Sequence, residues 1–353
     1  MSVIFVNSIS RTKAFCTKFG NFSKLTRHAS NDAVKNVHEN DIKKSVFISQ
    51  STDIYTNLAL EDWFYRNYDF TKHHVLLLWK NDPCVVIGRH QNPWVECNVP
   101  AIEQSSIALA RRNSGGGTVY HDAGNLNLSF FTPRERYNRR YNLEIITRSL
   151  FREWGLKSLI NKKEDILVDG EFKISGTAAK LGRPNAYHHC TLLINANKSV
   201  LSLALKKTET GITTNATESV RSPVKNLTEV NPQINIDTLL KAVGWEYLRT
   251  KALSVKDGGH SLVEQQKGFQ MINPTEDWFP GLEKLTEEFK SWDWTYGKSP
   301  KFTVTRLLEA PSQNVHNIMK LIIEVEKDSI IEASGCKVLA QDAILDKSNV
   351  AAL

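Results

Sequence analysis

Three consecutive glycines, Gly115, Gly116 and Gly117, follow a pair of arginines and lead into a strand-like segment. Glycine in a strand is unfavourable unless something approaches the backbone closely, because it has no side chain to pack. Arg111 and Arg112 indicate an anionic ligand, since guanidinium groups and bare backbone N–H groups both bind oxyanions. The segment therefore predicts a ligand site. Because a strand tolerates valine, we expect Gly116→Val to block the ligand at little cost in stability.

The clearest local prediction is a β-hairpin over residues 165–174. Two apolar runs flank Asp169–Gly170, the pair of residues favoured in a type I′ turn. Alternation along the second strand places Phe172 and Ile174 on one face and Lys173 on the other. A second hairpin is expected where residues 75–79 and 84–87 flank a turn.

Helices interrupt these strands without alternating regularly with them. Asp53 is expected to cap a helix from Ile54 to Tyr68. The other expected segments are strands over 126–132 and 191–194, a helix over 139–154 and a polar helical region over 232–296. This order predicts an α+β fold with a mixed, largely antiparallel sheet flanked by helices.

The positive charge is concentrated at the start of the chain. The net charge of the 353 residues is +7, yet residues 1–31 hold five basic residues and no acid, so the remainder carries only +2. A basic, acid-free leader containing Ser and Thr is typical of a mitochondrial transit peptide, with a disordered basic tail as the alternative. The nearly neutral body argues against nucleic acid as a partner.

The five cysteines show no CxxC pair and no metal-ligand spacing, so we expect free thiols, mostly buried, and no metal site. The longest apolar runs are far shorter than a transmembrane helix of about 18 residues. We therefore expect no membrane insertion.

Several blocks resemble the lipoate–protein ligase and lipoyltransferase family, in the same order along the chain. They are Leu78–Asn81 with Val86–Asn98, Arg111–Asn125, Lys173–Gly176, His188–Leu193 and Ser219–Leu227. The resemblance covers roughly residues 46–302 and implies a biotin/lipoate protein ligase-like catalytic domain over residues 42–296. Residues 297–353 are then a small C-terminal accessory domain, expected to be truncated because the resemblance fades after Phe302.

The resemblance also implies the site. Lys173 is the expected catalytic residue, because one ammonium can stabilise charge on both the acyl oxygen and the leaving phosphate. The expected lipoyl-AMP-binding residues are Arg112, Ser114, Gly115, Gly116, Gly117, Thr118, Val119, Tyr120, His121, Lys163 and Thr191. For Tyr120 and Thr191 core packing is an equal interpretation, and for Lys163 a plain surface lysine is the stronger one.

Two neighbouring pairs of residues suggest other chemistry. Cys190 beside His189 could form a nucleophilic pair, and His121 beside Asp122 could form an acid–base pair. Adjacent residues on a strand point to opposite faces. A buried structural thiol and a hydrogen-bonding His121 are therefore the favoured interpretations.

The resemblance implies transfer of a lipoyl group to a lysine of the lipoyl domains of 2-oxoacid dehydrogenase E2 subunits. The donor is lipoyl-AMP or a lipoylated carrier such as the glycine-cleavage H protein, with no tightly bound cofactor. One alternative is a lipoate–protein ligase that uses ATP and Mg²⁺, and another is a non-catalytic scaffold that binds lipoyl domains. We expect a monomer in the mitochondrial matrix.

Overall fold

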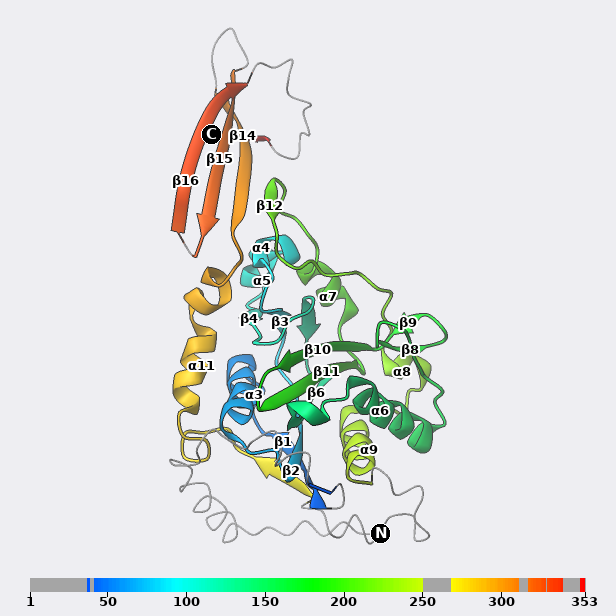
Figure 1. The fold of residues 1–353 in the computed structure, drawn as a ribbon. Helices are drawn as coiled ribbons and strands as arrows, with labels where there is room; N and C mark the ends of the chain where they lie inside the picture. Colours follow the sequence, from blue (N-terminus) through cyan, green and yellow to red (C-terminus); the bar gives the residue numbers. More distant parts are fainter. Residues whose placement is uncertain are drawn as a thin grey trace.

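The computed structural model describes residues 37–38, 41–249, 268–310, 317–327, 329–338 and 350–352. The predicted leader, residues 1–31, lies outside the described residues. The centre of the molecule is a six-stranded sheet in the order β10-β11-β6-β2-β1-β13 (Figure 1). Its strands are β10 (Ser175–Leu181), β11 (Asn185–Leu193), β6 (Asn125–Pro133), β2 (His73–Trp79), β1 (Lys43–Ser49) and β13 (Phe269–Ile272). The pairs β10–β11, β11–β6 and β6–β2 are antiparallel, and the pairs β2–β1 and β1–β13 are parallel. The sheet is therefore mixed, as expected.

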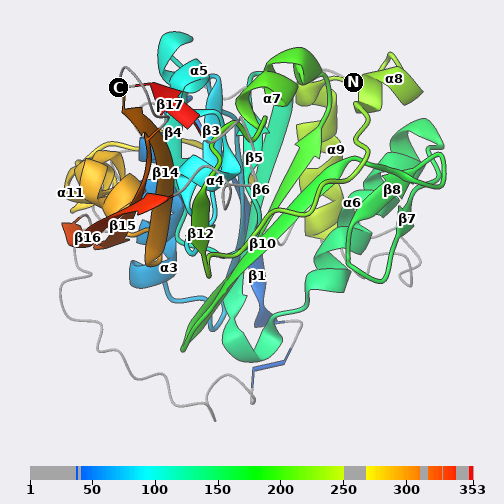
Figure 2. The same cartoon turned by 90° about the horizontal axis from the view of Figure 1, so that it is seen from above.

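Helices cover both faces of this sheet (Figure 2). On one face lie α6 (Arg139–Trp154) and α9 (Ile236–Arg249), and on the other lie α3 (Ile54–Asn67) and α11 (Leu282–Lys290). Each face carries its own cluster of buried apolar side chains. The central strands are buried at nearly every position, and β2 is accordingly a continuous apolar run after its two histidines. In β6 and β11 buried polar side chains such as Asn127, Ser129 and His189 interrupt the apolar ones.

The two helices predicted with defined ends are confirmed. The side chain of Asp53 accepts a hydrogen bond from the N–H of Thr56 at 2.7 Å and caps α3. The other helix, α6, ends at Gly155 in the left-handed conformation with φ 64°.

A second, three-stranded sheet consists of β4 (Ala108–Arg111), β3 (Cys84–Ile87) and β5 (Val119–His121). The predicted hairpin of residues 75–79 and 84–87 is therefore wrong, because β2 belongs to the central sheet and β3 pairs with β4 and β5. Both β2 and β3 are buried at almost every position. Each forms its backbone hydrogen bonds with strands that are distant in sequence, and not with the other.

A third sheet of three strands consists of β7 (Leu159–Ile160), β8 (Ile166–Val168) and β9 (Phe172–Lys173). The predicted hairpin is confirmed, since β8 and β9 are antiparallel and both predicted turn residues have positive φ, 48° at Asp169 and 84° at Gly170. The connection is one residue longer than predicted, because Val168 pairs with Phe172 and Glu171 also belongs to the turn.

The region 232–296 is less helical than predicted. Within its described part, β13 is a strand of four residues that pairs in parallel with β1, more than 200 residues earlier in the chain. A strand this short carries little periodicity, and its pairing partner is invisible locally.

The end of the chain forms a separate sheet that projects from the catalytic region (Figure 1). It contains β14 (Phe302–Ala310), β15 (Asn317–Glu326) and β16 (Ser329–Val338), with β17 (Val350–Ala352) beside β14. Its other edge is β12 (Ile212–Thr214), which comes from within the predicted catalytic domain. The remaining short helical segments are α4 (Pro93–Glu96), α5 (Val99–Gln104), η3 (Arg134–Arg136), α7 (Lys198–Ala204), α8 (Leu227–Val230) and η5 (Asp293–Gly297).

The described cysteines agree with the prediction of free thiols. Cys84, Cys97 and Cys190 are unpaired and buried, while Cys16 lies outside the described residues. Among the described residues, none of the helices has the length and apolar content needed to cross a membrane.

Candidate active site

The glycines lie in a loop between β4 and β5, not in a strand. Gly116 has a φ of 93°, where an L side chain is strained. A Cβ on Gly88, at the end of β3, would lie 2.1 Å from the carbonyl oxygen of Gly116, so the two backbones touch. The expectation that Gly116→Val costs little stability is therefore wrong, because the position is left-handed rather than extended.

Arg112 holds this glycine loop in shape. Its guanidinium donates to the carbonyl oxygens of Val86 at 3.1 Å, Gly115 at 2.7 Å and Gly117 at 2.7 Å. Burial lowers the pKa of Arg112 to about 10, so the side chain still carries its charge at neutral pH. The predicted nucleotide contact of Arg112 stays a prediction, and in this structure its hydrogen bonds go to the loop.

The prediction that Arg111 binds an anionic ligand is not supported, because its guanidinium is buried and donates to backbone carbonyls that join the site to the C-terminal region. Its fully buried guanidinium donates to the carbonyl oxygens of Thr295 at 2.6 Å and Gln91 at 2.7 Å, and to Ser299 Oγ at 3.0 Å. In return Trp294 Nε1 donates to the carbonyl oxygen of Arg111 at 2.8 Å. The two neighbouring arginines thus brace the glycine loop and the start of the accessory sheet.

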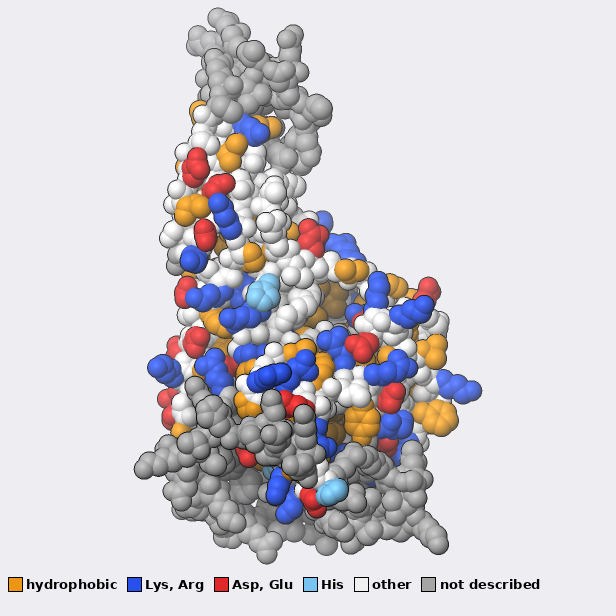
Figure 3. Space-filling model, viewed as in Figure 1, with side chains coloured by type: hydrophobic (Ala, Val, Ile, Leu, Met, Phe, Trp, Pro, Cys, Tyr) orange, Lys and Arg blue, Asp and Glu red, His pale blue; other side chains and the backbone are white. Residues whose placement is uncertain are grey.

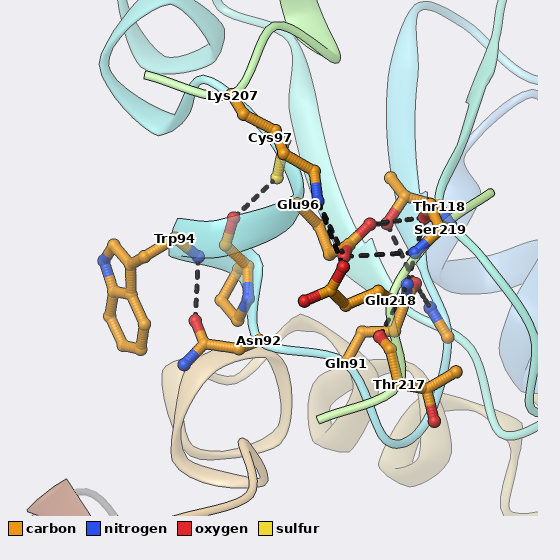
Figure 4. A network of polar contacts seen from close by, with 12 residues as sticks. Gln91, Asn92, Trp94, Glu96, Cys97, Thr118, Lys207, Thr217, Glu218 and Ser219 are labelled. Carbon is orange, nitrogen blue, oxygen red and sulfur yellow. Dashed lines mark hydrogen bonds and ion pairs between the residues drawn. The ribbon is translucent and has the colours of Figure 1, made fainter. Parts of the chain in front are cut away.

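A network of polar side chains fastens the loop around Ser219 onto the glycine loop (Figure 4). The Thr118 N–H donates to Ser219 Oγ at 2.8 Å, and Ser219 Oγ donates in turn to the carboxylate of Glu96. Gln91 accepts from Thr118 Oγ1 at 2.8 Å and donates to the carbonyl oxygen of Thr217 at 3.2 Å. Glu96 is 3% exposed and has Lys207 Nζ 3.8 Å from its Oε1.

Sequence reasoning assigned no role to Gln91, Glu96 or Ser219, although all three lie in the family-like blocks. Their position within those blocks could have indicated a role in the site. The contacts between their side chains could not be predicted, because they depend on how the fold brings the blocks together.

Lys173 lies beside the segment that follows Ser219. Its Nζ is 2.6 Å from Asp165 Oδ1, across the β8–β9 hairpin. The backbone N–H of Lys173 donates to the carbonyl oxygen of Pro223 at 2.9 Å, and its own carbonyl oxygen accepts from the N–H of Lys225 at 3.1 Å. The segment after Ser219 thus continues as a neighbour of the lysine.

Strand β10 brings the lysine and the glycine loop together, because it begins two residues after Lys173. A Cβ on Gly116 would lie 3.6 Å from the carbonyl oxygen of Thr177, and a Cβ on Gly176 would lie 3.6 Å from Val119 Cγ1. Thr191 Oγ1 accepts from the N–H of Gly176 at 3.0 Å.

The remaining predicted residues lie at different depths. Tyr120 packs in a third apolar cluster, and burial raises its pKa to about 12. Ser114 is buried, and its carbonyl oxygen accepts from the N–H of Arg89 at 2.9 Å. Lys163 lies on the exposed turn between β7 and β8, and its backbone N–H donates to Asn161 Oδ1 at 2.9 Å.

His121 and His189 each contact a side chain other than the neighbour considered in the sequence analysis. His121 is buried, with Nδ1 3.0 Å from Asn81 Nδ2, and burial lowers its pKa, which keeps the ring neutral. His189 Nδ1 lies 2.9 Å from Glu61 Oε1 on the α3 side of the sheet. Cys190 packs in the cluster on the α6 side, and burial raises the pKa of its thiol to about 12. The interpretation of Cys190 as a structural thiol agrees with this geometry.

The described residues contain no group of three or more His, Cys, Asp or Glu side chains arranged to hold a metal ion. Strand β10 links the glycine loop, which contacts Thr177, to the ion-paired ammonium of Lys173 four residues earlier in the chain. On a mixed sheet flanked by helices, bare backbone and a fixed ammonium can bind a ligand that carries an anionic group.

Comparisons with known proteins identify the family. Residues 53–247 match the lipoyl protein ligase A/B catalytic domain. The mitochondrial lipoyl amidotransferase of Mus musculus is 45% identical over 83% of this chain and 75% of its own length, and the Homo sapiens counterpart is 43% identical over 80% and 73%. A lipoate-protein ligase A of Bdellovibrio bacteriovorus is 36% identical over 74% of each chain. The crystal structure of P. falciparum LipL1 in complex with lipoate superimposes with a TM-score of 0.61 at 27% identity, covering 83% of this chain and 84% of that one.

The chain belongs to the lipoyl protein ligase A/B catalytic-domain family. It is an enzyme of the acyltransferase class, and the expected biotin/lipoate protein ligase-like fold is confirmed.

Proposed function

We propose that this protein transfers a lipoyl group from lipoyl-AMP, or from a lipoylated carrier such as the glycine-cleavage H protein, to a lysine of E2 lipoyl domains. The observation that carries the proposal is the Lys173–Asp165 pair, 2.6 Å apart, just before the strand whose Thr177 lies against the glycine loop. The 43–45% identity to two lipoyl amidotransferases supports it.

In the proposed reaction the uncharged ε-amine of the acceptor attacks the lipoyl carbonyl carbon. A C–N bond forms, the C–O bond to the phosphate breaks, and AMP leaves while the surplus proton on the amine passes to solvent. Negative charge develops on the carbonyl oxygen and on the leaving phosphate. The ammonium of Lys173 stabilises both, and Asp165 positions that ammonium before the substrate arrives.

The glycine loop provides the surface on which the mixed anhydride lies. Arg112 fixes the loop, and Gly115, where nothing lies within 4 Å of an added Cβ, allows the acyl chain and the phosphate to approach the backbone. The missing side chains of Gly116 and Gly117 leave room for Arg112 and Ser219. Ser219 and Glu96 hold the covering segment against Thr118. In this account Val119 and Thr191 contact the acyl chain, since both lie next to Gly176.

The source of the activated acyl group separates the proposal from its nearest alternative. Lipoate-protein ligases of the same family are 36–37% identical to this chain, which keeps an ATP-dependent ligase as the second candidate. Higher identity to amidotransferases favours transfer. We expect efficient transfer from preformed lipoyl-AMP and little exchange of pyrophosphate into ATP in the presence of lipoate. Robust exchange would move the assignment to ligase, and acceptor binding without transfer from any donor would indicate the scaffold.

We further propose that the enzyme works in the mitochondrial matrix, because residues 1–31 combine five basic residues with no acid. The two amidotransferase relatives are named as mitochondrial. A fusion of residues 1–45 to a fluorescent reporter tests this, since a reporter that remains in the cytosol contradicts import.

A further inference from the structure

The third sheet carries a continuous row of side chains that ends at the proposed catalytic lysine. Leu159 on β7 is opposite Leu167 on β8, and Leu167 is opposite Lys173 on β9. Val224 forms an isolated parallel bridge with Lys173 and extends the row. Residues directly opposite each other in a sheet project from the same face. Leu159, Leu167, Lys173 and Val224 therefore share one face, named here the lysine face.

The lysine face is open to solvent and partly apolar. Leu159 is 64% exposed, while Leu167 and Val224 are half-buried. Val220, on the segment that leads to Val224, is 79% exposed. Single exposed leucines are common, but an apolar row that leads to a reacting group is characteristic of an interaction surface.

The charged groups around the lysine face are mostly positive once internal pairs are removed, although the exposed Glu171, two residues before Lys173, adds a negative charge on that side. Asp165 is paired with Lys173, and Asp169 with Lys225 at 2.6 Å. Among the described residues, no ion pair involves the exposed side chains of Lys157, Lys162, Lys163 and Arg221. Figure 3 shows blue Lys and Arg side chains next to orange apolar ones over the region of β8 and β9, at the right of the view.

The reach of an acceptor lysine restricts where its protein can dock. A lysine side chain spans about 6 Å, so the acceptor backbone must come close to the acyl carbonyl beside Lys173. Neighbouring strands are about 4.8 Å apart, which places Leu159 about 10 Å from Lys173 across two strands. A folded acceptor that presents its lysine to Lys173 therefore covers the lysine face.

We propose that the lysine face is the docking surface for the acceptor domain. This inference rests on the proposed function. The partner that fits is a small folded domain with its target lysine at an exposed turn, acidic side chains beside that lysine, and an apolar side chain that packs on Leu159. The lysines around the face steer this acidic partner, and the apolar contact slows its release.

The first test separates docking from chemistry. Leu159→Asp is compared with Met271→Asp, a control on β13 whose parent side chain is 54% exposed. Each variant receives lipoyl-AMP and either an apo lipoyl domain or hydroxylamine, a small nucleophile that needs no docking. We expect Leu159→Asp to lower kcat/KM for the domain at least tenfold while hydroxamate formation and the control stay normal. Unchanged kcat/KM for the domain would overturn the docking proposal. A wild-type protein that acylates neither nucleophile would instead overturn the proposed function.

The second test concerns charge. The double variant Lys162→Glu with Lys163→Glu is compared with Lys284→Glu, an exposed α11 lysine for which no ion pair is described. For the double variant we expect kcat/KM for the lipoyl domain to fall about tenfold at low salt and to lose its dependence on ionic strength. Equal salt dependence in the double variant and in wild type would contradict the acidic-partner assignment.

Discussion

Replacing Lys173 by alanine removes the group on which the proposed mechanism depends. The lost ammonium no longer stabilises the acyl oxygen or the leaving phosphate, and loss of one such group typically lowers kcat by 10²–10³, which corresponds to about 3 kcal/mol. The stability cost should be about 1–3 kcal/mol, because the Lys173 side chain is 24% exposed while the carboxylate of Asp165, whose side chain is 13% exposed, loses its ion-pair partner. The assay is single-turnover transfer from saturating lipoyl-AMP to a saturating apo lipoyl domain, followed by mass spectrometry, with thermal unfolding of the same preparation.

The chain offers a matched control for this variant. Lys225 lies beside Lys173, and its side chain is 25% exposed. Its Nζ is 2.6 Å from Asp169 Oδ2, the same distance as in the Lys173–Asp165 pair. Lys225→Ala should therefore lose a comparable ion pair and keep kcat within about threefold of wild type, the change expected of a surface substitution. The reasoning is refuted if Lys173→Ala retains near-normal kcat, or if both variants lose activity equally.

Three further predictions address the rest of the site. Glu96→Gln should raise KM for lipoyl-AMP about tenfold, close to 1.4 kcal/mol, because the amide cannot accept every hydrogen bond of the buried carboxylate. Glu218→Gln, at a position 70% exposed, is the control. Equal KM values for the two variants would contradict this role of Glu96. Gly116→Val should destabilise the protein by about 2 kcal/mol and abolish lipoyl-AMP binding in calorimetric titration, because φ is 93° and the new Cβ would lie 3.0 Å from Arg112 Nη2; normal binding would count against the close-approach argument. Cys190→Ser should retain transfer. The native Cys190 thiol should resist iodoacetamide at pH 8, because burial raises its pKa to about 12 and thiolate forms only as the pH rises towards that value. Rapid alkylation of Cys190 in the folded protein would contradict this.

Local signals in the sequence predicted the local structure well. Asp169–Gly170 specified a turn with two positive φ values, and Asp53 specified the start of α3. Both depend on residues within a few positions of one another, so the physics that selects them is present in a short window. The glycine run predicted close approach of a ligand, which stays a prediction; the structure shows close contact with the backbone at Gly88.

Contacts between distant segments could not be predicted in this way. Strand β13 pairs with β1 across more than 200 residues, and no local pattern marks that partnership. Asp165 was visible as part of the hairpin, yet its ion pair with Lys173 depends on the register across the turn. Glu96 and Ser219 meet only because α4 and the segment after β12 both pack against Thr118.

In the proposed reaction the lipoyl group passes directly from the donor to the acceptor lysine, without a covalent enzyme intermediate. A time course of intact-protein mass spectrometry tests this, with the full chain mixed with lipoyl-AMP and an apo lipoyl domain. We expect the domain to gain one lipoyl group on a single lysine while the mass of the enzyme stays unchanged at every time point. A lipoyl group that appears first on the enzyme, or an acceptor that remains unmodified, would contradict it.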